Sequence, residues 1–285
     1  MSAPTAPLDV AGGSGPLELV AAKPFSLVYR SDDGTAYVKV YRAIDPGVRR
    51  DREIEGLRLA AWFGVSAPTL LRTGEATVGP WIEVSAVSGR PCGIDTPHAL
   101  THYLDQVLTT TGLVHRPVET VPTGYHRTRL LSQLTHRCRK LSWWPTLHAA
   151  LADVDSAPRV HLHGDLKPDH LFVHGKQLSV IDWENSTAGP AAQDYADAAF
   201  HLVRDLLLAG TSPRDIPVQA IGQLPVTGSA LAWRIALWLD RRRRTDITLL
   251  TVDDIEALTT TATAEASIRA CATVVAGLLS GGVPR

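Results

Sequence analysis

Short apolar runs separated by turns fill the first third of the chain. Residues 25–30 and 36–41 are β-prone, and the polar segment Ser-Asp-Asp-Gly-Thr at 31–35 separates them. Two such runs joined by Asp and Gly predict a β-hairpin. With its neighbours, this pattern predicts strands over residues 17–20, 25–30, 36–41, 70–72 and 79–86.

One helix is expected between these strands. Apolar residues recur at helical spacing within residues 49–63, with charged residues on the other side, and Gly64 and Pro68 follow. We therefore predict a small β-rich lobe over residues 17–88 that carries a single helix. A flexible, Ala/Pro/Gly-rich N-terminus over residues 1–16 precedes it.

The pattern changes from about residue 96. Residues 97–112 and 127–140 have helical periodicity, as does most of 191–279. The segment 157–182 is different, with short apolar runs and a His-Gly-Lys turn. The sequence thus predicts an α+β, two-lobed fold whose larger, mostly helical lobe spans residues 89–285.

Composition excludes several classes of protein. The 285 residues are 45% hydrophobic and 20% charged, with a formal net charge of −1, so no global positive field favours nucleic-acid binding. The basic run at 241–244 has two interpretations, a solvated helix end or a local anion or acidic-partner site. Three scattered cysteines argue against a disulfide framework and structural zinc. Without a signal peptide or an apolar span, we expect a cytoplasmic protein that binds no membrane. The oligomeric state is left open.

Candidate chemistry gathers in residues 161–184. A polar loop at 163–170 lies between two apolar runs, and Asp182 comes seventeen residues after Asp165, at the end of a strand. A hairpin between them is expected to bring both carboxylates to one cleft. Phosphoryl transfer uses such a pair, since one carboxylate orients the attacking hydroxyl and another holds Mg²⁺.

The motifs here resemble a known family. His-Gly-Asp at 163–165 and Ile-Asp-Trp at 181–183 are similar to the paired motifs of aminoglycoside phosphotransferases and their choline- and fructosamine-kinase relatives, which share a protein-kinase-like fold. Residues 189–196 resemble the segment that follows in that family. Further resemblances run in the family's order from about residue 20 to 205, while the remainder carries no recognisable motif. They lie at Lys39, Glu53, 67–70 and 113–115.

The resemblance implies a role for each matching residue. Asp165 would be the catalytic base or hydroxyl-orienting carboxylate, and Asp182 would bind the metal. Lys39 would contact the phosphates of ATP or GTP, with Glu53 as its ion-pair partner. Asp194 would brace the catalytic loop. Mg²⁺, or Mn²⁺ in its place, would accompany the nucleotide.

Further nucleotide contacts are expected from the small lobe. Residues 83–86, including Glu83 and Ser85, would offer backbone groups to the base. The loop at 23–26 is the preferred cover for the phosphates, where Ser26 is either a contact or only a strand residue. The glycine-rich segment 12–15 lies too far from the first firm strand for this role.

Two loop residues need separate interpretation. The family has Asn where this chain has His170, and a neutral imidazole is a poor ligand for Mg²⁺ and a better one for Mn²⁺ or Zn²⁺. Either His170 binds metal differently, or it supports the loop while Asp182 holds the ion, or activity is weakened. Lys167 resembles the lysine of serine/threonine kinases that neutralises the transferred phosphate, and the alternative is a solvated loop lysine.

Three functions fit these observations. The first is a phosphotransferase acting on a hydroxyl of a small molecule such as an antibiotic, a sugar or an amino alcohol, with Asp197, Asp205 or Asp215 contributing to the acceptor pocket. The second is a Ser/Thr kinase for a precursor peptide in natural-product maturation. The third is a pseudokinase binding module. Metal-dependent nucleotide turnover separates the third from the others, and the acceptor that stimulates it separates the first two.

Overall fold

The computed structural model describes residues 16–118, 128–242 and 246–281. The predicted flexible N-terminus, with its glycine-rich segment 12–15, lies outside the described residues except for residue 16. Residues 243 and 244 of the basic run lie outside them as well.

The chain forms two compact units, which are described separately. Unit 1 comprises residues 16–90 and 172–186, and unit 2 comprises the described residues of 91–171 and 187–281. Residues 172–186, which the sequence pattern placed in the larger lobe, therefore group with unit 1. The predicted α+β fold, with an antiparallel sheet in one part and helices in the other, is confirmed.

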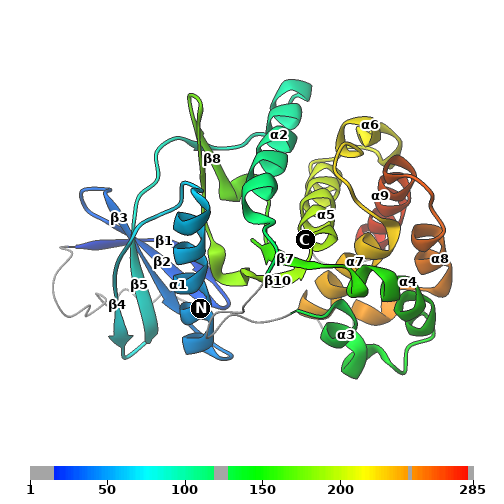
Figure 1. Cartoon of the computed structure of the whole chain (residues 1–285), viewed down its shortest axis with the longest axis horizontal. Helices are drawn as coiled ribbons and strands as arrows, with labels where there is room; N and C mark the ends of the chain where they lie inside the picture. Colours follow the sequence, from blue (N-terminus) through cyan, green and yellow to red (C-terminus); the bar gives the residue numbers. More distant parts are fainter. Residues whose placement is uncertain (1–15, 119–127, 243–245, 282–285) are drawn as a thin grey trace. The chain divides into compact units, whose positions relative to one another are not determined.

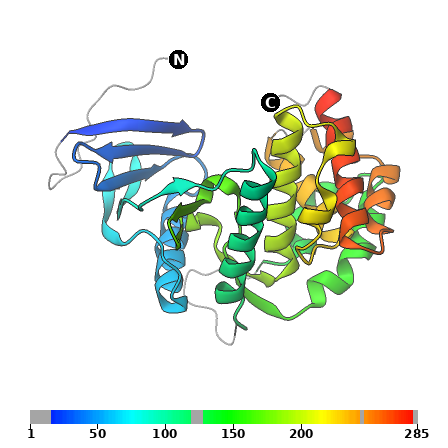
Figure 2. The same cartoon turned by 90° about the horizontal axis from the view of Figure 1, so that it is seen from above.

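Unit 1 is built on a five-stranded antiparallel sheet (Figures 1 and 2). Its strand order is β1-β2-β3-β5-β4. The side chains of Leu27, Val38, Val40 and Trp81 are buried on it and form a small core. The strands are β1 (Leu17–Lys23), β2 (Ser26–Ser31), β3 (Ala36–Tyr41), β4 (Leu70–Ala76) and β5 (Gly79–Ser85).

Helix α1 (Pro46–Phe63) packs against β3 and β5 of this sheet (Figure 1). Pro46 suits the first helical turn, where its missing N–H has no intrahelical partner. Gly64 ends the helix in the left-handed conformation, with φ of 72°, and its N–H bonds to the last carbonyls. The helix thus stands beside the central strand β3.

The hairpin of β8 (Leu171–His174) and β9 (Gln177–Val180) leads to the short 3₁₀ helix η2 (Trp183–Asn185). Gly175 supplies the positive φ that the turn requires. In unit 1, η2 packs closely against α1, and Trp183 leaves no room for a Cβ at Gly56. This contact places the residues around 182 next to α1. The two-residue strand β6 (Arg90–Pro91) lies where the chain passes from unit 1 to unit 2.

Unit 2 consists mainly of helices around the buried helix α7 (Gly228–Arg242). Every residue from 230 to 240 is buried, so its charged Arg234 and Asp240 need partners inside the protein. Asp240 pairs with Arg137 at 2.6 Å. The other helices are α2 (Pro97–Val114), α3 (Leu130–Cys138), α4 (Trp144–Ser156), α5 (Ala192–Leu208), α6 (Val218–Ile221), α8 (Val252–Thr259) and α9 (Ala264–Ser280), with 3₁₀ turns η1 (Pro168–His170), η3 (Pro213–Asp215) and η4 (Asp246–Leu249).

A two-stranded ribbon completes unit 2. Strand β7 (Arg159–Leu162) pairs with β10 (Thr187–Pro190) in antiparallel register, and the predicted catalytic loop starts directly after β7. Helix α5 follows β10 and packs against α7 and α9 (Figure 2). The loop therefore starts from β7, a strand that is paired with β10 within unit 2.

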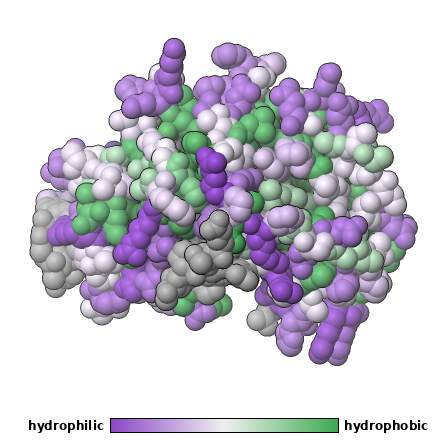
Figure 3. Space-filling model, viewed as in Figure 1, coloured by the Kyte–Doolittle hydropathy of each residue, from purple (hydrophilic) through white to green (hydrophobic). Residues whose placement is uncertain are grey.

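On the face of the molecule drawn in Figure 3, hydrophilic and hydrophobic residues are interspersed. None of the helices in the described part of the chain is both long and apolar enough to span a membrane.

Candidate active site

In unit 1, the strand lysine and the helix glutamate predicted from the sequence form an ion pair. Lys39 lies on β3 and Glu53 on α1, and the distance from Lys39 Nζ to Glu53 Oε2 is 2.7 Å. Both residues are buried, at 9% and 6% exposure. The Tyr41 hydroxyl also donates a hydrogen bond to Glu53 Oε2. The packing of α1 on β3 thus fixes the lysine ammonium in one place.

Asp182 joins the same cluster from the segment after β9. Its Oδ1 lies 2.6 Å from Lys39 Nζ. The backbone of Asp182 is left-handed, with φ of 64° and ψ of 61°, a conformation that costs energy for a residue other than glycine. Such strain is concentrated at functional sites, where it fixes the direction of a side chain.

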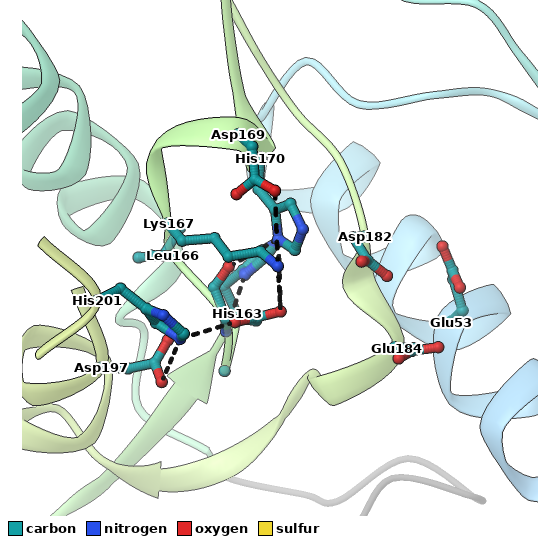
Figure 4. Close-up of polar contacts among 12 residues, drawn as sticks. Glu53, His163, Leu166, Lys167, Asp169, His170, Asp182, Glu184, Asp197 and His201 are labelled. Atoms are coloured by element: carbon teal, nitrogen blue, oxygen red, sulfur yellow. Dashed lines mark hydrogen bonds and ion pairs between the residues drawn. The ribbon is translucent and has the colours of Figure 1, made fainter. Parts of the chain in front are cut away.

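Glu184 is a member of this cluster that the sequence analysis did not single out (Figure 4). Its Oε2 lies 3.1 Å from Lys39 Nζ, and its Oε1 lies 2.6 Å from Arg49 Nη2. The only signal in the sequence is its position two residues after Asp182. Glu184 links Lys39 to the first turns of α1.

Electrostatics in this cluster keep the lysine charged. Burial alone lowers the pKa of Lys39, but the carboxylates of Asp182 and Glu53 raise it well above its usual value. Burial raises the pKa of Glu53, an effect that Lys39 opposes. A permanently charged ammonium surrounded by carboxylates is suited to a phosphate ligand and a divalent cation.

The donor set of this cluster fits the Mg²⁺ implied by the family. One carboxylate oxygen each from Glu53, Asp182 and Glu184 lies within 4.8 Å of the others. Mg²⁺ prefers oxygen ligands and is usually held by one or two carboxylates together with substrate phosphates. Asp182 and Glu184, which are both partly exposed, are the residues that would hold it.

The other predicted nucleotide contacts also lie in unit 1. Ser26 is buried at the start of β2. Glu83 is buried on β5 and pairs with Arg72, so its carboxylate is already engaged. The Ser85 hydroxyl accepts a hydrogen bond from the Thr69 N–H at 2.9 Å. Their nucleotide-binding roles stay predictions.

In unit 2, the catalytic loop is held by Asp194 of α5. Its carboxylate accepts hydrogen bonds from the backbone N–H groups of His163 at 3.0 Å and Gly164 at 2.8 Å. His115 Nε2 lies 3.0 Å from the same carboxylate. Gly164 has a φ of 80°, which glycine adopts without strain. The prediction that Asp194 braces this loop is confirmed.

Asp165 follows this braced segment, and its side chain is 17% exposed. Its Oδ2 lies 3.7 Å from Lys167 Nζ and 3.6 Å from His170 Nδ1, and its Oδ1 lies 3.4 Å from His201 Nε2. Burial raises the pKa of Asp165. The contact with His201 and the nearby His170 and Lys167 lower this pKa by more than burial raises it, so that it lies below its usual range. Asp165 is therefore an ionised carboxylate suited to orienting a hydroxyl.

His170 and Lys167 support this loop in different ways. His170 is buried, and its Nδ1 lies 2.9 Å from the backbone oxygen of Asp165, which makes Nδ1 the donor in that hydrogen bond. Its role as a metal ligand stays a prediction. Lys167 Nζ lies 3.7 Å from the carboxylates of both Asp165 and Asp169, at ion-pair rather than hydrogen-bond distance.

A cavity of about 220 Å³ lies beside this loop in unit 2. Asp205, proposed for an acceptor pocket, lines it and pairs with Arg204 at 2.6 Å. Asp215 is exposed on η3. Asp197 is buried and paired with Arg234, so it belongs to the interior of the unit rather than to an acceptor surface. The lining residues are Pro91, Cys92, Ile94, Lys167, Pro168, Asp169, Arg204 and Asp205.

An α+β fold with a lysine–glutamate pair in one unit and a braced aspartate loop in the other defines a kinase-like phosphotransferase. The family model described as "Phosphotransferase enzyme family" matches residues 25–233. The chain belongs to this family and is an enzyme that transfers phosphate to hydroxyl groups. No curated protein sequence is significantly similar to it.

Solved structures share this fold at low sequence identity. A choline/ethanolamine kinase family protein from Mesorhizobium loti is 18% identical with a TM-score of 0.60, over 93% of this chain and 97% of that chain. A mutant of aminoglycoside 2'-phosphotransferase-IIIa in complex with GDP is 16% identical with a TM-score of 0.59, over 95% and 92%. An aminoglycoside phosphotransferase from Streptomyces rimosus is 17% identical with a TM-score of 0.52, over 94% and 95%.

Proposed function

We propose that this enzyme transfers the γ-phosphate of ATP or GTP to a hydroxyl group of a small molecule. The observation that carries the proposal is the ion-pair cluster of Lys39, Glu53 and Asp182 in unit 1. A strand lysine held by a helix glutamate next to a metal-binding aspartate is the arrangement with which protein kinases bind nucleotide phosphates.

The nucleotide assignment also draws on solved relatives. Names of structures with this fold include a GDP complex of aminoglycoside 2'-phosphotransferase-IIIa, an ADP-bound APH(2'')-Ib and a streptomycin–ATP complex of APH(2'')-IIa. Both purine nucleoside triphosphates therefore remain candidates for this chain. Ser26, Glu83 and Ser85 are proposed to lie near the nucleotide.

The proposed mechanism divides the work between the residues already described. Lys39 binds nucleotide phosphate oxygens and is kept in place by Glu53. Asp182 and Glu184 would hold Mg²⁺, which would neutralise phosphate charge when bound. Asp165 accepts a hydrogen bond from the acceptor hydroxyl and orients its oxygen for attack, and Lys167 neutralises charge on the transferred group. The loose transition state makes such positioning the main contribution of the protein.

We propose a neutral or zwitterionic acceptor. The cavity beside the catalytic loop is lined by two cations, Lys167 and Arg204, and two anions, Asp169 and Asp205. A site for a polycation is expected to carry an excess of carboxylates, because uncompensated negative charge attracts a cationic ligand and repels an anionic one. A balanced lining offers no such excess.

A panel of acceptors tests this function. Release of nucleoside diphosphate from MgATP and MgGTP is measured with glucose, free serine, choline, ethanolamine, kanamycin, streptomycin, a macrolide and a serine-containing peptide. We expect at least one neutral or zwitterionic small molecule to stimulate turnover, and Asp165→Asn to lower kcat by about 10²-fold or more. Stimulation by the peptide alone would replace the small-molecule function with that of a peptide kinase.

Asp153→Asn is the matched control, because Asp153 is an exposed residue of helix α4 in the same unit. We expect this variant to retain nucleotide binding and to change turnover by less than about threefold. Equal activity of Asp165→Asn and wild type would contradict the role proposed for Asp165.

A further inference from the structure

Two neighbouring arginines at the start of α1 have partners of different kinds. Arg50 pairs with Asp51 and Glu75, whose side chains are 58% and 70% exposed. Such surface pairs contribute little to stability. Arg49 pairs instead with Glu184, and their side chains are only 17% and 14% exposed. The mechanism above uses Glu184 but gives Arg49 no role.

Arg49 engages one oxygen of the Glu184 carboxylate. Its Nη2 donates a hydrogen bond to Oε1 at 2.6 Å, a short distance that is typical of hydrogen bonds between charged groups. The other oxygen, Oε2, lies 3.1 Å from Lys39 Nζ. In the described part of the chain no group hydrogen-bonds Oε2, although this oxygen is buried. The carboxylate therefore has one oxygen that is fixed and one that can still bind a ligand.

The second oxygen of Glu184 is suited to a divalent cation. A buried carboxylate oxygen without a hydrogen bond is costly, because it has lost water without gaining a partner. Glu184 offers a ligand atom within 4.8 Å of ligand atoms from Asp182 and Glu53. Metal ligands are commonly oriented by hydrogen bonds from neighbouring groups, and loss of such a partner typically lowers metal affinity by about 10- to 100-fold. Arg49 has the position of such a partner.

The guanidinium group of Arg49 is itself held in place. Its Cζ lies 4.9 Å from the centre of the Phe25 ring, and Phe25 belongs to the turn between β1 and β2. Its Nη1 lies 3.5 Å from the backbone oxygen of Phe25, at the outer limit of a hydrogen bond. An aromatic ring against the face of a guanidinium leaves the edge, which carries the N–H groups, directed at a carboxylate. The contacts with Phe25 and Glu184 together favour one orientation of the side chain.

We propose that Arg49 is a positioning residue for the nucleotide and metal site, which holds Glu184 through Oε1 so that Oε2 is presented to Mg²⁺. The inference rests on the function proposed above, in which Asp182 and Glu184 hold the ion. Because Arg49 acts through Glu184, its loss should weaken binding of the Mg²⁺–nucleotide complex. The same loss should have little further effect once Glu184 is altered.

A double-mutant cycle on Arg49 and Glu184 tests the proposal. Arg49→Met keeps an unbranched stem but removes the charge and the N–H groups, and Glu184→Gln keeps the shape but offers the metal a neutral amide. The probe is the Kd of MgATP or MgGTP, whichever binds the wild type more tightly, measured by calorimetry. We expect each single variant to raise the Kd about tenfold, and the Kd of the double variant to lie within about twofold of that of Glu184→Gln.

Two further readouts would not respond to a merely structural role. Arg49→Lys retains a charged donor but not the planar fork, so its Kd should lie within about threefold of wild type. In Arg49→Met, the Mg²⁺ concentration that gives half-maximal nucleotide binding should rise about tenfold. Arg58→Met is the matched control, because Arg58 lies on the same helix with a side chain that is 70% exposed. It should change the Kd by less than about twofold.

The outcomes separate this inference from the proposed function. A wild-type Kd in folded Arg49→Met, or single-variant effects that multiply to about 100-fold in the double variant, would show that Arg49 does not act through Glu184. A higher Kd in Arg49→Met with an unchanged Mg²⁺ requirement would mean that Arg49 contacts the nucleotide itself, which also overturns the positioning role. In these cases the proposed function stands. Absence of Mg²⁺-dependent nucleotide binding in the wild type would overturn the proposed function and this inference with it.

Discussion

At the scale of single residues, the chain concentrates charge in places where it is buried and paired. Lys39 has three carboxylate neighbours, and the nearest two lie 2.6 and 2.7 Å away. Each charged residue in such a cluster depends on the others, because a buried charge that loses its partner is costly. Substitution of one member should therefore alter ligand binding through its neighbours.

Glu53→Gln tests this dependence. The amide no longer balances the charge of Lys39, so Asp182 and Glu184 draw the ammonium away from the position in which it meets a phosphate. We expect the Kd for MgATP or MgGTP to rise about tenfold, equivalent to about 1.4 kcal/mol. Isothermal titration calorimetry measures the change.

Glu55→Gln is its control on the same helix. Glu55 pairs with the largely exposed Arg58 at 3.4 Å, and surface ion pairs contribute little. Its Kd should match that of the wild type. An unchanged Kd in Glu53→Gln would show that Glu53 does not position Lys39 for nucleotide.

The three cysteines give a prediction about pH. Burial raises the pKa of Cys92 and Cys138 to about 11 and that of Cys271 to about 12. The thiolate is the reactive form, so at pH 8 only about 10⁻³ of a thiol with pKa 11 is ionised. A chromogenic disulfide reagent should label the native protein slowly at pH 8 and faster as the pH rises. In denaturant it should label all three thiols rapidly. Fast labelling of native protein at pH 8 would contradict their burial.

The main site residues predicted from the sequence each lie within a recognisable local motif. Lys39 lies in a β-prone run, and Asp165 and Asp182 lie in distinctive triplets. Glu184, His201 and Arg234 have no such setting. Arg234 meets Asp197 across 37 positions of sequence, and only the packing of α7 on α5 brings them together.

At the scale of elements, the contact between α1 and η2 controls the placement of Asp182. Glycine in a helix is normally less favourable than alanine by about 1 kcal/mol. At Gly56, however, a Cβ would lie 2.7 Å from Trp183 Cβ and 2.9 Å from its backbone oxygen. The helix therefore needs glycine at this position for close packing.

Gly56→Ala should destabilise the protein by about 1–3 kcal/mol, because overpacking outweighs the gain in helix propensity. Gly112→Ala on α2 is the control, since no described atom beyond its chain neighbours and the helix's own backbone lies within 4 Å of its Cβ position, and it should stabilise the protein slightly. Thermal unfolding midpoints measure both changes. A stabilised Gly56→Ala variant would mean that α1 and η2 are not packed as described.

The elements that the sequence pattern missed also have physical reasons. Strand β10 has the sequence Thr-Ala-Gly-Pro, and Gly and Pro are unfavourable in strands. It forms because β7 pairs with it, a contact that no local pattern reveals. Helix α4 starts at Trp144 with Pro145 in its first turn, next to residues that gave no clear periodicity. The hairpin and α1 were predicted because their turns and caps are local.

At the scale of the whole molecule, membership of the phosphotransferase family and the two groups of site residues lead to one account. Unit 1 contributes Lys39, Glu53, Asp182 and Glu184, and unit 2 contributes Asp165 on a loop braced by Asp194. Under this account, nucleotide affinity depends on residues of unit 1, and transfer to the acceptor also depends on unit 2. Variants in the two units should therefore differ in kind, with a change in Kd for the first and in kcat for the second.

The central claim is that the cluster around Asp182 binds a nucleotide together with a divalent cation. Calorimetric titration of ATP and GTP, with Mg²⁺ and with a chelator, into wild type and Asp182→Asn tests it most directly. Asp51→Asn is the control, because Asp51 is an exposed residue of α1 in the same unit. The account predicts Mg²⁺-dependent binding in wild type and Asp51→Asn, and a Kd at least about tenfold higher in Asp182→Asn. Binding that is independent of both Mg²⁺ and Asp182 would contradict it.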